Sequence, residues 1–129
     1  MAGERLHLAR RPQAAAEARR ALENLKGTLR EPLLADLRLL VTEVVTTRVN
    51  AKASDAANWL ELEFEASDGS VTVKLTDVGR HWVFEPAPNA FDPESSSGWS
   101  LYLVDRLADR WGVTREDPAV TIWFELEGD

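Results

Sequence analysis

Three short segments carry the side chains best suited to hold a ligand. "LLVTEVVTTRVNAKA" contains Glu43 and Thr47, whose spacing of four places them on one face of a helix. "LTDVGRHWVF" begins like a strand that delivers an aspartate, Asp77, to a ligand and continues through Gly79. "SGWSLYLVDRLADRWGV" leads into a helical pattern at Gly98. Each segment lies where a helix or strand borders a loop, which is where ligand sites are usually built.

The spacing of apolar residues predicts three helices that position these segments. Apolar residues recur at intervals of three and four between residues 12 and 28, which predicts a first helix with Gly27 as its stop signal. A second helix begins at Glu31 and Pro32, and its apolar stripe runs towards Val49. The segment "GWSLYLVDRLAD" predicts a third helix.

Strict alternation of apolar and polar residues predicts the strands. "RLHLA" favours a short opening strand, and "WLELEFEAS" and "VTVKL" form a hairpin around the turn "SDGS". "RWGVTRE" and "AVTIWFELE" close the chain around a turn at residues 117–118. The order β-α-α-β-β-loop-α-β-β predicts an α+β fold, with helices on one face of a mixed or mainly antiparallel sheet.

Length and composition exclude several classes of protein. We expect one domain spanning residues 1–129, because this length suits one core, and a reducing compartment, because cysteine is absent. No apolar run approaches the roughly 20 residues that cross a bilayer, and the first residues lack the apolar core of a signal peptide. We therefore expect a cytoplasmic protein without membrane contact. The net charge of -7 argues against direct nucleic-acid binding.

The charge is unevenly distributed along the chain. Residues 1–30 contain seven basic and three acidic side chains, which leaves about -11 for the remainder. One interpretation is a solvated helix face. The other is a basic docking surface for an acidic protein partner. The residues assigned to that surface are Arg10, Arg11, Arg19 and Arg20.

Taken together, the three segments resemble the Bergerat-fold (GHKL, HATPase_c) ATPase domain. More narrowly, they are similar to bacterial anti-sigma-factor serine kinases, especially the small actinobacterial versions, and "LVDRLADRWGV" is the most specific part. The resemblance covers nearly the whole chain and implies a two-layer α/β sandwich with three helices on one face of the sheet. It also implies ATP and Mg²⁺ as cofactors, and a sigma factor or a STAS-type anti-anti-sigma factor as partner. Such proteins are often homodimers.

By this resemblance, the second helix carries the first motif of the site. Glu43 takes the position of the general base that activates the attacking hydroxyl or water; without the family, a partly exposed helix carboxylate is the simpler interpretation. Thr47 takes the position of the family's magnesium-binding asparagine. Its hydroxyl can ligate Mg²⁺ but is shorter than an amide arm. Asn50 lies nearly one turn further along and is a poor substitute.

The second motif corresponds to the adenine contact. Asp77 matches the aspartate that accepts a hydrogen bond from the adenine amino group in the family, and Gly79 matches the first glycine. His81 stands where the second glycine belongs, and Trp82 adds further bulk. A histidine tolerates positive φ less well than glycine does.

The third motif corresponds to the phosphate end of the site. Gly98 and Leu101 match the family pattern, whereas Ser100 replaces its second glycine and is expected to cap the helix. The helix amino end is an anion site in the family, and Trp99 is either core or a bulky plug. The preceding loop, residues 85–97, corresponds to the ATP lid and contains no basic residue.

Each motif therefore departs from the family at one key residue: Thr47, His81 and Ser100. These three departures predict weak or lost use of ATP and Mg²⁺. Three functions stay open: an anti-sigma-like binding protein with weak or absent ATP turnover, an active protein-serine kinase acting on a STAS partner, and a non-catalytic scaffold subunit.

Overall fold

The computed structural model describes residues 2–50, 59–78, 96–116 and 119–128, and its elements follow the predicted order. Their bounds are β1 Ala2–Ala9, α1 Ala14–Leu22, the 3₁₀ helix η1 Glu23–Leu25, α2 Glu31–Asn50, β2 Trp59–Ser67, β3 Ser70–Val78, α3 Ser96–Leu107, β4 Arg110–Glu116 and β5 Ala119–Leu126. Among these residues, no helix is long and apolar enough to cross a membrane.

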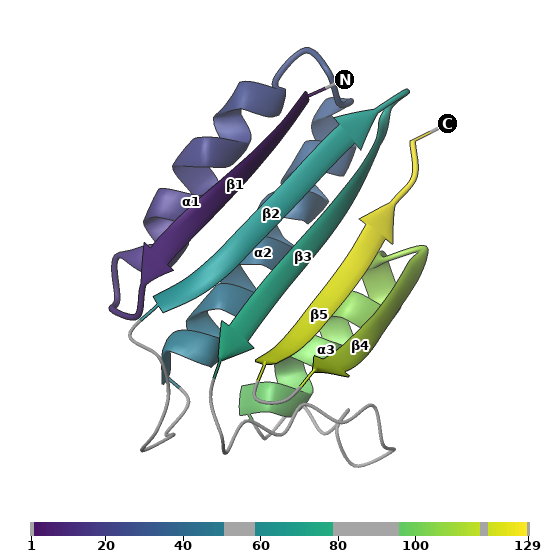
Figure 1. The fold of residues 1–129 in the computed structure, drawn as a ribbon. Helices are drawn as coiled ribbons and strands as arrows, with labels where there is room; N and C mark the ends of the chain where they lie inside the picture. The colour runs from purple at the N-terminus through teal and green to yellow at the C-terminus, as the bar shows by residue number, and fades with distance from the viewer. Residues whose placement is uncertain (1, 51–58, 79–95, 117–118, 129) are drawn as a thin grey trace.

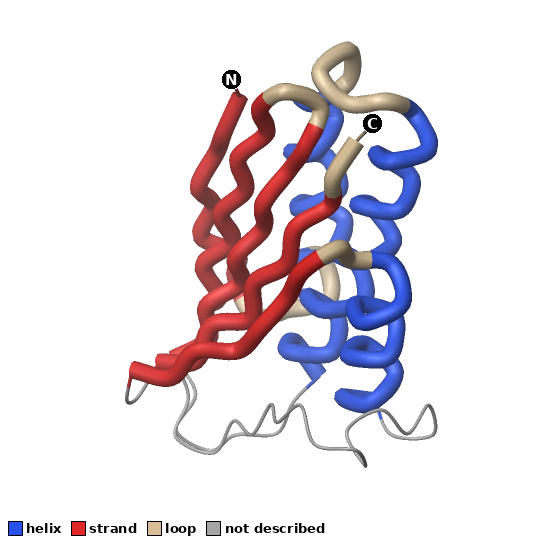
Figure 2. Tube along the Cα trace, turned by 90° about the vertical axis from the view of Figure 1, so that its right-hand side faces the viewer, coloured by secondary structure: helices blue, strands red, loops and turns tan. Residues whose placement is uncertain are grey.

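The strands form one five-stranded sheet with the order β1-β2-β3-β5-β4. Every pairing between the described strands is antiparallel, so the expected mainly antiparallel sheet contains no parallel strand pair in this part of the chain. The three helices cover one face of the sheet and leave the other face open (Figures 1 and 2). The α+β two-layer sandwich predicted from the sequence is confirmed.

The turn between β2 and β3 shows how local sequence fixes the register. Asp68 and Gly69 both have positive φ, at 55° and 80°, and Ser67 pairs with Ser70 across the two-residue loop. Paired positive φ values are the mark of a type I′ turn, for which Asp-Gly is a preferred sequence. This register places Leu62, Phe64 and their partners on the helix side.

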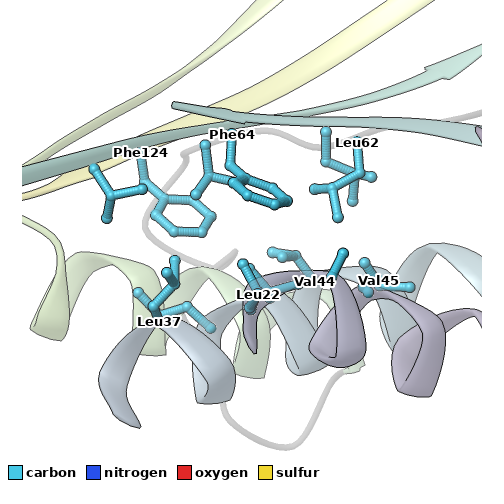
Figure 3. Packing of buried hydrophobic residues seen from close by; sticks show 14 of the residues in the cluster. Leu22, Leu37, Val44, Val45, Leu62, Phe64 and Phe124 are labelled. Carbon is cyan, nitrogen blue, oxygen red and sulfur yellow. The ribbon is translucent and has the colours of Figure 1, made fainter. Parts of the chain in front are cut away.

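The core lies between the sheet and the helices (Figure 3). Leu62, Phe64 and Phe124 project from the sheet towards Leu22 and Val44 on the helices, and all five side chains are at most 1% exposed. Full burial of one such side chain stabilises the fold by about 1.5–3 kcal/mol. The alternation and the helical stripes read from the sequence therefore identify the packed faces.

Two helix boundaries differ from the predictions. The first helix ends at Leu22 and continues only as a 3₁₀ turn to Leu25, rather than reaching Thr28. The third helix begins at Ser96, so Ser100 lies in its second turn. The prediction that Ser100 caps this helix is therefore wrong, and Gly98 lies inside the helix.

The predicted site residues gather at one end of the sandwich. The carboxyl ends of β1, β3 and α2 and the start of α3 all lie at the lower end of the view in Figure 1. The antiparallel order β1-β2-β3 requires β1 and β3 to run in the same direction, so both strands finish at this end. This end of the molecule is where the candidate site is built.

Candidate functional site

Helix α2 places two neighbouring polar residues in a buried setting. Val41, Val44 and Val45 are fully buried, and Arg48 follows them at helical spacing on the same stripe. The Arg48 side chain is 3% exposed, and Thr47 beside it is also buried. An arginine in an apolar stripe needs a nearby acceptor, because burial of an unpaired charge is costly.

Strand β3 supplies the carboxylate. Val73 and Leu75 point into the core, and the two-residue period of a strand places Asp77 on the same side. Asp77 is only 1% exposed.

Two guanidinium groups take the two oxygens of Asp77. Arg48 donates from Nε to Oδ2 at 3.2 Å. Arg10, which directly follows β1, donates to Oδ1 and also to the backbone carbonyl of Arg48 at 2.6 Å. That carbonyl lies in the last turn of α2, where carbonyl groups lack partners within the helix. We call Arg10, Arg48 and Asp77 the arginine-aspartate cluster.

Burial dominates the electrostatics of Arg48. It lowers the pKa of this guanidinium to about 10, although the charge of Asp77 and its hydrogen bond act in the opposite direction. Arg48 therefore stays protonated at neutral pH. Removal of either Arg48 or Asp77 leaves the other charge without this partner in a buried site. It therefore costs more free energy of unfolding than the pair contributes to stability.

A second buried contact joins α2 to α3. The hydroxyl groups of Thr47 and Ser100 are hydrogen-bonded to each other, and Ser100 donates to the backbone carbonyl of Glu43 at 3.1 Å. Ser100 is fully buried and Thr47 is 8% exposed. The two residues that the resemblance places at the family's asparagine and glycine positions thus bond to each other across the helix interface.

Comparison with known proteins places this geometry in a family. The family model described as "Histidine kinase-like ATPase domain" matches residues 8–125. The chain belongs to this family. No curated protein matches the chain.

Among solved structures, the chain is similar to the crystal structure of the RsbU and RsbW domains of Rv1364c from Mycobacterium tuberculosis. The TM-score is 0.72 at 18% sequence identity, and the alignment covers 98% of this chain. It covers 32% of the other chain, so the likeness extends over about a third of that protein's structure. At this identity the likeness supports the fold, and it agrees with the histidine kinase-like ATPase architecture.

The remaining predicted site residues belong to neither of these two polar contacts or lie outside the described residues. Glu43 is half-buried, and no described residue forms a hydrogen bond or ion pair with its carboxylate. Leu101 is fully buried in the core, where it packs between the layers. Gly79 and His81 lie outside the described residues, as do Trp82 and residues 85–95.

The residues assigned to a basic docking surface separate into two groups. Arg10 is turned inward with 12% of its side chain exposed and belongs to the arginine-aspartate cluster, so its assignment to an exposed surface is corrected. Arg11 and Arg20 are exposed, and Arg19 is half-buried and donates to the Thr42 hydroxyl of α2 at 3.1 Å.

The arrangement does not fit the Mg²⁺-nucleotide that histidine kinase-like ATPases take. Both oxygens of Asp77 already accept from guanidinium groups, and the Thr47 hydroxyl is engaged with Ser100. Among the described residues, no group of three or more His, Cys, Asp or Glu side chains is placed to hold a metal ion. A single threonine hydroxyl would hold Mg²⁺ only weakly, since this ion is usually bound by carboxylates and phosphates.

The hydroxyl contact yields a stability prediction. We expect Ser100→Ala to lower the free energy of unfolding by roughly 1–3 kcal/mol, because it removes the buried hydrogen bonds of Ser100 to the Thr47 hydroxyl and the Glu43 carbonyl. A Thr47→Val, Ser100→Ala double-mutant cycle in urea should give a coupling energy of roughly 0.5–3 kcal/mol. Additive effects of the two substitutions would contradict the contact. Thr46→Val, at an exposed position of α2, is the matched control.

Arg48 is the candidate-site residue that sequence reasoning missed. The signal was present, because Val41, Val44, Val45 and position 48 follow the spacing of one buried helical stripe. A charged residue in that stripe indicates a buried partner of opposite charge. The role of Arg10 had no comparable signal, since it depends on a contact 67 residues away in the chain.

Proposed function

We propose that this chain is an anti-sigma-like binding module that recognises a sigma factor, a STAS-type anti-anti-sigma factor, or both, with weak or absent ATP turnover. The observation that carries the proposal is the engagement of both Asp77 oxygens by Arg10 and Arg48. A ligand donor would have to compete with these two guanidinium groups for the carboxylate oxygens. The Thr47 and Ser100 contact supports the same conclusion at the phosphate end.

Calorimetric titration with Mg²⁺-ATP, and separately with ADP, tests this proposal. We expect no detectable heat from either nucleotide, and a melting temperature that is unchanged at millimolar nucleotide, because a ligand that binds only the folded state must raise it. Micromolar binding of Mg²⁺-ATP would contradict the proposal and restore the kinase function.

The basic residues of α1 provide the second prediction on function. We expect Arg19→Glu with Arg20→Glu to weaken binding to a candidate sigma or STAS partner by at least about tenfold, because reversal of two charges opposes an acidic partner. The melting temperature should change little, since Arg20 is exposed and the Arg19 contact to Thr42 is partly exposed. The control is Arg110→Glu on β4, which is the edge strand opposite β1 in the sheet. Unaltered affinity of the double variant would exclude α1 as the docking surface.

An active protein-serine kinase is the second candidate function. It is favoured by the half-buried Glu43, whose carboxylate is not engaged by any described residue and so stays available to act as a base. A kinase would transfer phosphate to a STAS partner and lose this activity in Glu43→Ala. Phosphotransfer assayed in both proteins distinguishes the two functions.

A further inference from the structure

We propose that Arg10 is an internal ligand of Asp77. Its guanidinium binds the carboxylate oxygen that would otherwise accept a hydrogen bond from a nucleotide base. The inference rests on the proposed function and deepens it, because it names the residue that closes the base end of the site. The base contact of Asp77 is the one that the family resemblance assigns. What the structure adds is the identity of the group that takes its place.

The two guanidinium groups of the arginine-aspartate cluster are held differently. Arg48 projects from a 20-residue helix, and its side chain is 3% exposed. Arg10 projects from the short connection between β1 and α1, and its side chain is 12% exposed. Helix α2 thus holds Arg48 in place, whereas Arg10 reaches Asp77 from the more exposed rim of the site.

Arg10 is not required to offset the charge of Asp77. The ion pair with Arg48 already neutralises this carboxylate within the buried site. Arg10 adds an ion pair to the other oxygen and a hydrogen bond to a carbonyl in the last turn of α2. A carboxylate has acceptor sites on both oxygens, so loss of Arg10 leaves Oδ1 able to accept from a ligand.

Adenosine is the probe for this end of the site, because it has the exocyclic amino donor but no phosphate. It therefore tests the base contact independently of Thr47 and Ser100. We expect Arg10→Met to bind adenosine at least about tenfold more tightly than the parent chain, since a recovered hydrogen bond to a charged acceptor is among the stronger ones. Methionine retains an apolar stem of similar length and removes the guanidinium. Isothermal titration calorimetry measures the change, and the rise in melting temperature at millimolar adenosine provides a second readout.

Two controls separate this role from a structural one. Purine riboside has a hydrogen in place of the amino group and no proton on N1, so its affinity should be the same in Arg10→Met and in the parent chain. Arg11→Met removes an exposed guanidinium from the next position and should leave adenosine binding unchanged. Should Arg10→Met fail to give a cooperative melt, Arg10→Leu, which also has no hydrogen-bond donor, replaces it in the same titrations.

A folded Arg10 variant that binds adenosine no more tightly than the parent chain would overturn the inference. An equal gain for purine riboside would also overturn it, because Asp77 would not be the group that was released. A different result would contradict the proposed function, namely micromolar binding of Mg²⁺-ATP by the unmodified chain.

Discussion

Asp77→Asn is expected to lower the free energy of unfolding by roughly 3–5 kcal/mol, because it removes one partner from a buried ion pair. The substitution keeps the shape of the side chain but leaves Arg10 and Arg48 without the carboxylate that they share. Arg48 has the larger part in this loss, since burial already lowers its pKa to about 10 while Asp77 opposes that shift. Urea unfolding followed by circular dichroism measures the change.

The matched control is Asp36→Asn on α2, where the described residues show neither an ion pair nor a hydrogen bond to the carboxylate. It should change the free energy of unfolding by no more than about 0.5 kcal/mol. An equal loss in both variants would mean that the arginine-aspartate cluster adds nothing specific to stability.

Replacement of the whole cluster separates the cost of an unpaired charge from the value of the cluster itself. Arg10→Met, Arg48→Met and Asp77→Leu together remove all three charges and refill the volume with apolar atoms. Buried ion pairs replaced in this way are often neutral or more stable. The triple variant should therefore recover most of the stability that Asp77→Asn loses, which would mean that the fold does not depend on the cluster for its stability.

The architecture was readable from the sequence because periodicity alone determines which faces are buried. Alternation at Leu60, Leu62 and Phe64 gave the strand, its buried face and its antiparallel partner. The stripe on α2 gave a long helix packed on one side. Neither inference needed knowledge of distant contacts, since burial of an apolar face is a property of each element.

The interior of the site was not readable in the same way. Resemblance located Glu43, Thr47, Asp77 and Ser100, but the partner of each polar group depends on which elements meet at the end of the sandwich. Ser100 was expected to cap a helix because its hydroxyl suits an N-cap, and the structure shows it bonded across to Thr47 and to the Glu43 carbonyl. A side chain's type indicates what it can bond to, whereas its actual partner is decided by packing.

The same limit explains the correction at Arg10. Sequence reasoning grouped it with Arg11, Arg19 and Arg20 because net charge is additive along a segment. Burial is decided residue by residue, and Arg10 lies just after β1, where its side chain reaches α2 and β3. A basic segment can therefore contribute one arginine to the interior and the next to solvent.

Restoration of the family's residues at both ends of the site should recover nucleotide binding. We expect Thr47→Asn, His81→Gly and Ser100→Gly combined with Arg10→Met to bind Mg²⁺-ATP at least ~100-fold more tightly than the parent chain, since each tenfold step needs only about 1.4 kcal/mol. Ser100→Gly ends the contact with Thr47, and Arg10→Met releases Asp77. Calorimetric titration of the parent, triple and quadruple variants measures the two contributions separately.

The comparison between the triple and quadruple variants decides where binding is limited. If Arg10 closes the base end, the three family substitutions alone should gain much less than the four together, because adenine would still meet an occupied Asp77. The triple variant combined with Arg11→Met is the matched control and should behave as the triple variant does. An equal gain with and without Arg10→Met would place the obstruction entirely at the phosphate end, where Thr47 and Ser100 join α2 to α3.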